Sequence, residues 1–396
     1  MAVVTVKSGH VQPVWAGHPW VYAQAVERVD GGAAPGDEVQ VLDPRGRPLG
    51  RGLYSPGSAI PVRLYTQKPD LPFDGALLRR RLERAVERRL RLGLPSDQTS
   101  GYRLVHAEGD ALPGLVVDRF GDIAVVQFGT LGMKRRQSLI LEAIAHAVQP
   151  RAIVDRTPPK IAEAEGFDAA TGVVAGDTTA ANLSFLELGS RYRIPLAVAQ
   201  KTGFYLDQRP LRQRVSALSA GRDVLDAFAF VGAMSIAAAR GGAGSVTLVE
   251  SSARALQVAA DCAALNGVSD RIRFECRDAR EALGRAGRLG GYDVVICDPP
   301  KYAPSRAARD RAVKAMRRLA GQACRATRPG GLLVLSSCSA ALGLHDLSLA
   351  LAVGARDAGR RPLVLERIFQ GPDHPVPAAF KEGLYLTTLV AEITPE

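Results

Sequence analysis

The sequence predicts a multi-domain α/β protein, with an N-terminal β-barrel, a central α+β domain and a C-terminal doubly wound sheet. Three observations support this prediction. The 396 residues are too many for one ordinary hydrophobic core. The first 68 residues contain short apolar runs between Gly, Pro and Asp turns, which is typical of a small barrel. After about residue 200, strand and helix patterns alternate, as in a doubly wound parallel sheet. We therefore expect domains at 1–70, 71–196 and 197–396.

The composition is that of a globular protein with a polyanionic partner. Hydrophobic residues make up 46% of the chain and charged residues 23%, which excludes a disordered protein. No apolar run approaches the roughly 20 residues that span a bilayer, and the first ten residues lack a signal-peptide pattern. We expect a cytoplasmic protein with no membrane partner. The net charge of +11 suits a nucleic acid. The five cysteines have no paired spacing, so neither a disulfide framework nor a metal site is expected.

The strands of the predicted barrel are short apolar runs in the first domain. Turn residues at 30–32, 43–46 and 55–58 separate them. The strands are expected at 20–22, 38–42, 49–54 and 60–64.

An amphipathic helix is predicted over 74–92, because Leu78, Leu82, Val86 and Leu90 recur every four residues. Seven arginines and two glutamates are expected on its outer face. Arginine forks match phosphate geometry, so this face is compatible with RNA contact as well as with simple solvation. The candidate RNA-binding residues are Arg79, Arg80, Arg84 and Arg88, and the other arginines of this face are Arg81, Arg89 and Arg91.

The rest of the central domain is predicted as two hairpins and a helix. Strands at 115–118 and 123–128 form the first hairpin, and strands at 183–188 and 192–194 form the second. A helix is expected over 133–148. No catalytic signature lies in this segment.

The C-terminal domain has the pattern of a ligand-binding sheet, in which ligands lie at the carboxyl ends of the strands. Glu250 ends the second strand, where a carboxylate can accept hydrogen bonds from ribose hydroxyls. The loop from Asp226 to Ala233 lacks G-x-G-x-x-G, so no pyrophosphate cradle is evident. This favours S-adenosylmethionine (AdoMet) over a nicotinamide dinucleotide. The strands are expected at 223–226, 246–250, 272–274, 292–297 and 332–335.

The stretch from Val294 to Tyr302 reads VVICDPPKY and predicts a site. Its apolar run indicates a buried parallel strand that ends at Asp298. Pro299 and Pro300 lack amide protons and restrict φ, so the chain turns stiffly after the acid. Asp-Pro-Pro turns of this kind flank the target base in methyltransferases.

Several motifs carry a resemblance to a known family. KTGFYLDQR at 201–209, DPPKY at 298–302, SCS at 337–339, DHP at 373–375 and EGLYL at 382–386 resemble the bacterial ribosomal RNA large subunit methyltransferase I family. HPWVY at 18–22 and GRGLY at 50–54 resemble a PUA domain, an RNA-binding barrel.

The resemblance covers essentially the whole chain and implies a PUA-like domain, a central α+β domain and a Rossmann-like AdoMet-binding domain. It also implies formation of 5-methylcytosine in large-subunit ribosomal RNA by a homodimer. The chain departs from the family at Val231 to Ala233, where a threonine and a second glycine are usual, and at Glu250, where Asp is commoner. The cofactor-binding residues that we expect are Phe204, Gln208, Arg209, Asp226, Phe228, Gly232, Glu250, Asp278 and Asp298.

Methylation at carbon 5 of a pyrimidine needs a nucleophile, because that carbon is itself a poor one. A thiolate that adds to carbon 6 creates a carbanion at carbon 5. Cys338 follows the strand at 332–335, which is expected beside the strand that ends at Asp298, so these two are the predicted catalytic residues. Cys297 is the competing thiol, but it lies within its strand and is expected to be packed. Lys301, Arg306 and Arg309 are predicted RNA contacts, whereas Cys262, Cys276 and Cys324 are expected to be buried.

Two other functions are compatible with the sequence. Asp-Pro-Pro-Tyr turns bind planar amines, so amino-group methylation is an alternative, although Lys301 interrupts that pattern. The atypical loop at Val231 to Ala233 would also suit a non-catalytic RNA-binding scaffold with a decayed cofactor pocket.

Overall fold

The computed structural model describes residues 1–169, 171–302, 309–339 and 341–396. The chain forms two compact units. Unit 1 comprises Met1–Phe185, Ala199–Leu206 and Pro372–Gly383, and unit 2 comprises Leu186–Val198, Asp207–Gly371 and Leu384–Glu396. The division into three domains with boundaries near residues 70 and 196 stays a prediction.

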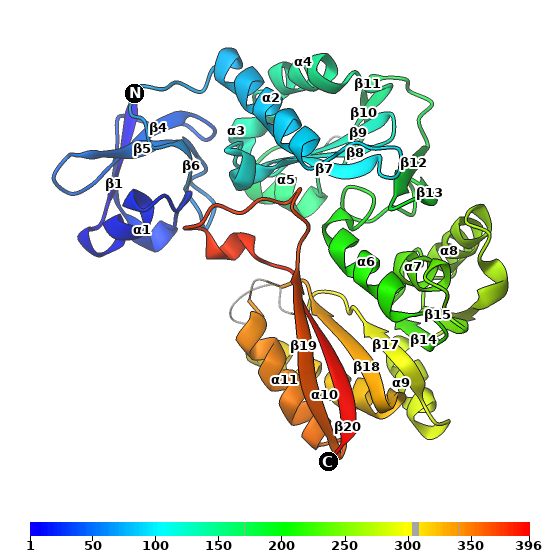
Figure 1. Ribbon diagram of the computed structural model, residues 1–396. Helices are drawn as coiled ribbons and strands as arrows, with labels where there is room; N and C mark the ends of the chain where they lie inside the picture. Colours follow the sequence, from blue (N-terminus) through cyan, green and yellow to red (C-terminus); the bar gives the residue numbers. More distant parts are fainter. Residues whose placement is uncertain (170, 303–308, 340) are drawn as a thin grey trace. The chain divides into compact units, whose positions relative to one another are not determined.

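Unit 1 begins with a six-stranded sheet in the order β2-β6-β5-β4-β1-β3 (Figure 1). Its inner residues, among them Val4, Val39 and Val62, are fully buried and form a core of their own. The predicted barrel is therefore present, but the sequence reasoning missed its first and third strands. The strands are β1 (Ala2–Val6), β2 (Trp20–Val21), β3 (Val26–Asp30), β4 (Glu38–Leu42), β5 (Pro48–Tyr54) and β6 (Val62–Thr66).

The second sheet of unit 1 has the order β11-β10-β9-β8-β7. The first predicted hairpin is confirmed as β8 (Leu115–Phe120) and β9 (Ile123–Phe128), which pair antiparallel. The predicted helix over 133–148 is divided into α3 (Leu131–Lys134) and α4 (Gln137–Val148). The other elements here are α2 (Gly75–Arg91), β7 (Gly101–His106), β10 (Ala152–Asp155), α5 (Pro159–Glu165) and β11 (Gly172–Gly176).

Helix α2 confirms the predicted amphipathic helix but corrects its arginine face. Arg89 is only 1% exposed, and its guanidinium donates to both carboxylate oxygens of Asp110 at 2.7 and 2.9 Å. Arg81 also turns inward and donates to the backbone carbonyls of Tyr65 and Ala111. The expectation that all seven arginines face outward was wrong, because buried carboxylate and carbonyl acceptors draw two of them into the structure.

The segment Pro372–Gly383 packs within unit 1, although the residues that precede and follow it in the sequence belong to unit 2. The ring of Phe380 lies 4.6 Å from that of Trp20, and Glu382 accepts hydrogen bonds from His18 and Tyr22. The motif HPWVY thus contacts Glu382, the first residue of EGLYL, within unit 1. His374 is buried in the same segment beside Asp373, which agrees with a structural role for that turn.

Unit 2 contains a seven-stranded sheet in the order β16-β15-β14-β17-β18-β20-β19 (Figure 1). Strands β14 to β18 are parallel, as predicted, whereas β20 runs antiparallel between β18 and β19. The sequence reasoning missed β19 and β20. The strands are β14 (Asp223–Ala227), β15 (Ser245–Glu250), β16 (Ile272–Cys276), β17 (Tyr292–Cys297), β18 (Thr327–Ser337), β19 (Arg360–Phe369) and β20 (Thr387–Pro395).

Helices cover both faces of this sheet, as a doubly wound fold requires. One face packs against α9, α10 and α11, and its core includes Leu225, Val295 and Leu333. The second predicted hairpin, β12 (Asn182–Glu187) and β13 (Ser190–Pro195), is also confirmed. The helices are α6 (Arg209–Leu218), α7 (Ala233–Arg240), α8 (Ala253–Leu265), α9 (Ala279–Arg288), α10 (Arg309–Ala326) and α11 (Leu344–Arg356). Within the described ranges, no helix is both long and apolar enough to cross a membrane.

Candidate active site

Adjacent parallel strands bring the two predicted catalytic residues to one edge of the sheet. Strand β17 pairs with β14 on one side and with β18 on the other, and Cys297 is in register with Ala227 and Leu335. Asp298 follows Cys297 directly, and Cys338 lies three residues beyond Leu335, just after β18 ends. Both side chains therefore belong to loops at the carboxyl edge, where doubly wound sheets bind their ligands.

Asp298 is oriented by the end of the motif at 201–209. The side-chain amide of Gln208 donates to Asp298 Oδ2 at 2.6 Å, and Gln208 itself is buried. Arg209, the first residue of α6, is buried as well. The end of this motif therefore lies beside the Asp-Pro-Pro turn within unit 2, and its contact with the cofactor stays a prediction.

Asp207 is a residue that the sequence reasoning missed. It is buried, its carbonyl accepts from the Gly371 amide at 2.9 Å, and its Oδ2 accepts from the Tyr385 hydroxyl at 2.7 Å. Within unit 2, these bonds hold Asp207 against Gly371 and Tyr385, which precede and follow the segment 372–383 in the sequence. A signal was present, because Asp207 lies inside KTGFYLDQR and Tyr385 inside EGLYL.

The loop after β14 has an unusual backbone. Phe228 and Phe230 have φ of 67° and 52°, in the left-handed region that is uncommon for residues other than glycine. The Phe230 amide donates to Glu250 Oε2 at 2.9 Å. Gly232 has φ of 74°, and a Cβ there would lie 2.8 Å from a methyl carbon of Leu248. Backbone strain of this kind collects at ligand sites, and here it sets the shape of the loop.

Asp226 is turned away from this loop. It is 1% exposed, and its Oδ2 accepts from the backbone amide and the hydroxyl of Ser235, at 3.0 and 2.7 Å. Burial is the main cause that raises the pKa of Asp226 to about 7, and the charges of Asp298 and Glu250 add to it. These contacts describe a buried brace between β14 and α7, and a direct cofactor contact from Asp226 stays a prediction.

The thiols differ sharply in their surroundings. Cys297 is fully buried, as predicted, and burial raises the pKa of its thiol far above the usual range. Burial likewise raises the pKa of Cys324 to about 12. Cys338 is half-buried at the carboxyl edge. The expectation that Cys276 is buried was wrong, because it ends the edge strand β16 and is exposed.

Comparison with known proteins identifies the family. Residues 4–67 match the PUA-like domain family, and residues 149–386 match the S-adenosylmethionine-dependent methyltransferase family. Ribosomal RNA large subunit methyltransferase I of Alteromonas mediterranea is 36% identical over 379 residues, which is 95% of each chain. The protein of that name from Shewanella denitrificans is 34% identical over 393 residues, 98% of this chain and 99% of the relative.

The chain belongs to the ribosomal RNA large subunit methyltransferase I family.

A solved structure, SMU.776, described provisionally as a methyltransferase and crystallised with SAH, supports the fold of this methyltransferase I family member. It has a TM-score of 0.87 and 20% sequence identity, and the match covers 99% of this chain and 100% of that one. The predicted fold class and the prediction of AdoMet as the cofactor are confirmed.

The carboxyl edge of this methyltransferase I family member fits AdoMet. Asp278 Oδ1 caps α9 by accepting the amides of Arg280 and Glu281, while its Oδ2 has no hydrogen-bond partner within the described residues. Glu250 is half-exposed and ends β15, and its Oε1 accepts from the Ser252 amide. These two carboxylates lie at or just beyond the ends of the neighbouring strands β15 and β16, and their contacts with the ribose and adenine of AdoMet stay predictions. Phe204 belongs to unit 1, where its ring lies 5.1 Å from that of Phe185, and its cofactor contact stays a prediction.

The predicted RNA contacts fall into two groups. Arg79, Arg80, Arg84 and Lys301 are exposed. Arg88 instead pairs with the buried Asp110, and Arg309 pairs with Asp346 of α11. Arg306 lies outside the described residues. The two paired arginines can donate fewer hydrogen bonds to a phosphate, because an aspartate carboxylate already accepts from each guanidinium.

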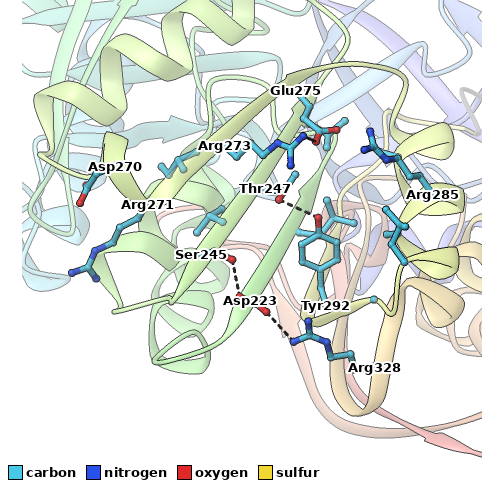
Figure 2. Close-up of a pocket in the computed structure, with 18 residues that line it drawn as sticks. Asp223, Ser245, Thr247, Asp270, Arg271, Arg273, Glu275, Arg285, Tyr292 and Arg328 are labelled. Atoms are coloured by element: carbon cyan, nitrogen blue, oxygen red, sulfur yellow. Dashed lines mark hydrogen bonds and ion pairs between the residues drawn. The ribbon is translucent and has the colours of Figure 1, made fainter.

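A separate cavity of about 520 Å³ opens at the opposite, amino-terminal edge of the sheet (Figure 2). Several of its polar groups pair with one another: Asp223 accepts from Ser245 and Arg328, and the Tyr292 hydroxyl donates to Thr247. This cavity contains none of the predicted catalytic residues.

Proposed function

We propose that the protein transfers the methyl group of AdoMet to carbon 5 of a cytosine in large-subunit ribosomal RNA, through a covalent adduct of Cys338 at carbon 6. The observation that carries this proposal is the adjacency of two loops. Asp298 follows β17, Cys338 follows β18, and these strands are paired neighbours. The names of the relatives support ribosomal RNA as the substrate.

The cofactor would be held at the carboxyl edge by several groups. Glu250 would accept the ribose hydroxyls, and Asp278 Oδ2 would accept the adenine amine. The loop from Phe228 to Gly232 would lie alongside the bound cofactor. We propose that Gln208, Arg209, Asp226 and Asp298 complete the pocket within unit 2, and a cofactor contact from Phe204 of unit 1 stays a prediction.

When bound, AdoMet supplies an electrophilic methyl group to carbon 5. The Cys338 thiolate forms the sulfur–carbon 6 bond, which moves the carbon 5–carbon 6 electron pair onto carbon 5. After methylation, carbon 5 loses its proton to solvent, the double bond reforms and the Cys338 thiolate leaves. Asp298, held by Gln208, accepts a hydrogen bond from the exocyclic amine and, in its protonated form, donates to ring nitrogen 3 as charge develops on the ring.

The RNA backbone would meet exposed basic side chains outside this pocket. We propose Arg79, Arg80 and Arg84 on α2 and Lys301 after the Asp-Pro-Pro turn as phosphate contacts. Arg88 and Arg309 would contribute less, because each already pairs with an aspartate. The homodimer and the cytoplasmic location stay predictions.

The test is replacement of the thiol. Cys338→Ala should abolish 5-methylcytosine in a large-subunit ribosomal RNA transcript while AdoMet binding, measured calorimetrically, is retained. Cys276→Ala, which removes another accessible thiol, is the matched control and should retain full activity. A transcript carrying 5-fluorocytidine should form a covalent complex with the wild type, because fluorine at carbon 5 blocks elimination, and none with Cys338→Ala.

Two results would redirect the proposal. If Cys338→Ala keeps its methylation rate and the product is N4-methylcytosine, the enzyme is an amino-group methyltransferase that uses the Asp-Pro-Pro turn without a thiol. If the wild type binds RNA but not AdoMet, the protein is a non-catalytic scaffold.

A further inference from the structure

Helix α10 carries a basic stripe whose members form no ion pair within the described residues, although the charge of Arg325 acts on Asp357. Arg311, Lys314, Arg318 and Arg325 are all exposed. Their spacing of three, four and seven residues places them on one side of the helix. In the part of the chain that the structure describes, none of the four forms an ion pair or a side-chain hydrogen bond.

Packing against α11 separates this basic stripe from the other arginines of α10. Arg309 pairs with Asp346, and Arg317 donates to both carboxylate oxygens of Asp357 at 2.7 and 2.9 Å. Gly321 fixes the rotation of α10, because a Cβ there would lie 2.9 Å from the Gly354 carbonyl oxygen. The paired arginines therefore face α11, and the basic stripe faces solvent.

Helix stability does not account for the basic stripe. Arg311 lies in the first turn and Lys314 in the second, near the positive end of the helix dipole, where acidic side chains would be favourable. Lys314 and Arg318 are four residues apart and repel each other. Arg325 lies in the last turn, where a basic side chain is favourable, but the first half of the stripe opposes its own helix in both ways and points to an anionic partner.

The stripe starts beside the candidate active site. Ala312, next to Arg311, is buried in a small cluster with Leu342 and Tyr302. Tyr302 lies four residues after Asp298, and Leu342 four residues after Cys338. The first turn of α10 is thus packed against both loops that carry the proposed catalytic residues.

We infer that Arg311, Lys314, Arg318 and Arg325 form a track for the phosphates of the substrate RNA, leading away from the methylated base. The track spans about 21 Å, since 14 residues at about 1.5 Å each separate its ends. Arginine and lysine bind phosphate oxygens without reading sequence, so the track would position the strand and not select the base. This inference rests on the proposed function, because it takes RNA as the substrate.

Salt dependence of RNA binding tests the track directly. We would compare the double variant Lys314→Gln/Arg318→Gln with Arg254→Gln/Arg271→Gln, which removes the same charge from exposed positions on α8 and just before β16. The probe is a large-subunit ribosomal RNA transcript, bound to the full chain with S-adenosylhomocysteine present. Loss of two phosphate contacts should reduce the slope of log K against log salt by about 1.4 for single-stranded RNA. The control should keep the wild-type slope.

The readouts separate this inference from the proposed function. S-adenosylhomocysteine binding and circular dichroism should be unchanged in both variants, and Lys314→Arg/Arg318→Lys should restore the slope. A stripe variant with the wild-type slope, or a control that loses as much as the stripe variant, would overturn the track. Failure of the wild type to methylate the transcript would overturn the proposed function alone, because the slope is measured by binding.

Discussion

Replacing Asp226 with asparagine should stabilise unit 2 at neutral and alkaline pH. The carboxyl group is buried between β14 and α7, and its donors among the described residues are the amide and hydroxyl of Ser235. Asparagine keeps an oxygen acceptor for both donors but cannot ionise. The variant therefore removes a buried charge and leaves the hydrogen bonds in place.

The size of the effect follows from the raised pKa of Asp226. The pKa rises from 3.8 to about 7 on folding, and one unit is worth about 1.4 kcal/mol, so ionisation costs the folded state about 4 kcal/mol. The pKa of Asp226 is higher in the folded state than in the unfolded state. The stability that its protonated carboxyl group contributes is therefore fully present below about pH 4 and is lost as pH rises toward about 7. Between pH 5 and pH 8, the wild type should lose about 2–3 kcal/mol relative to Asp226→Asn.

Urea unfolding followed by circular dichroism at pH 5 and pH 8 measures this difference. The transition of unit 2 is identified by its stabilisation with S-adenosylhomocysteine. If the difference in free energy of unfolding between Asp226→Asn and the wild type does not increase from pH 5 to pH 8, the raised pKa of Asp226 is refuted. The affinity for AdoMet is a second readout: an unchanged value indicates that Asp226 only braces the loop, whereas a loss supports a direct cofactor contact.

Two further substitutions test the packing behind the site. Gly232→Ala should weaken AdoMet binding at least tenfold, because the left-handed backbone costs about 1–2 kcal/mol for alanine and the new methyl would press on Leu248 and Ala259; calorimetric affinity equal to the wild type would contradict this. Glu187→Gln should destabilise unit 2 by about 3–5 kcal/mol, since it leaves the buried Arg212 without its carboxylate; urea unfolding measures the loss, and a change below about 1 kcal/mol would show that the pair is dispensable.

Patterns that depend on near neighbours were predictable from the sequence. The four-residue repeat of leucines identifies α2, and an apolar run that stops at an acid and two prolines identifies the carboxyl end of β17. Hairpins at 115–128 and 182–195 also follow from local turn signals. The pairing of β17 with β18, which brings the Asp298 and Cys338 loops to one edge, follows from the rules of doubly wound sheets.

Contacts between distant segments were decided only by the tertiary structure. On a helical projection Arg89 falls beside Leu78, on the apolar side of α2, but its partner Asp110, 21 residues away, is brought to it only by the tertiary structure. The chain excursion at 372–383 and the bonds of Asp207 to Gly371 and Tyr385 have no local period that could reveal them.

The sequence by itself determined the fold class, the family and the acid at the end of β17, because periodicity and short motifs record what each segment does locally. The tertiary structure decided which charges are paired and which remain available. On α10, the packing of Gly321 against Gly354 turns Arg309 and Arg317 toward the acids of α11 and leaves Arg311, Lys314, Arg318 and Arg325 in solvent. That distinction depends on how two helices meet, and a single helix does not encode it.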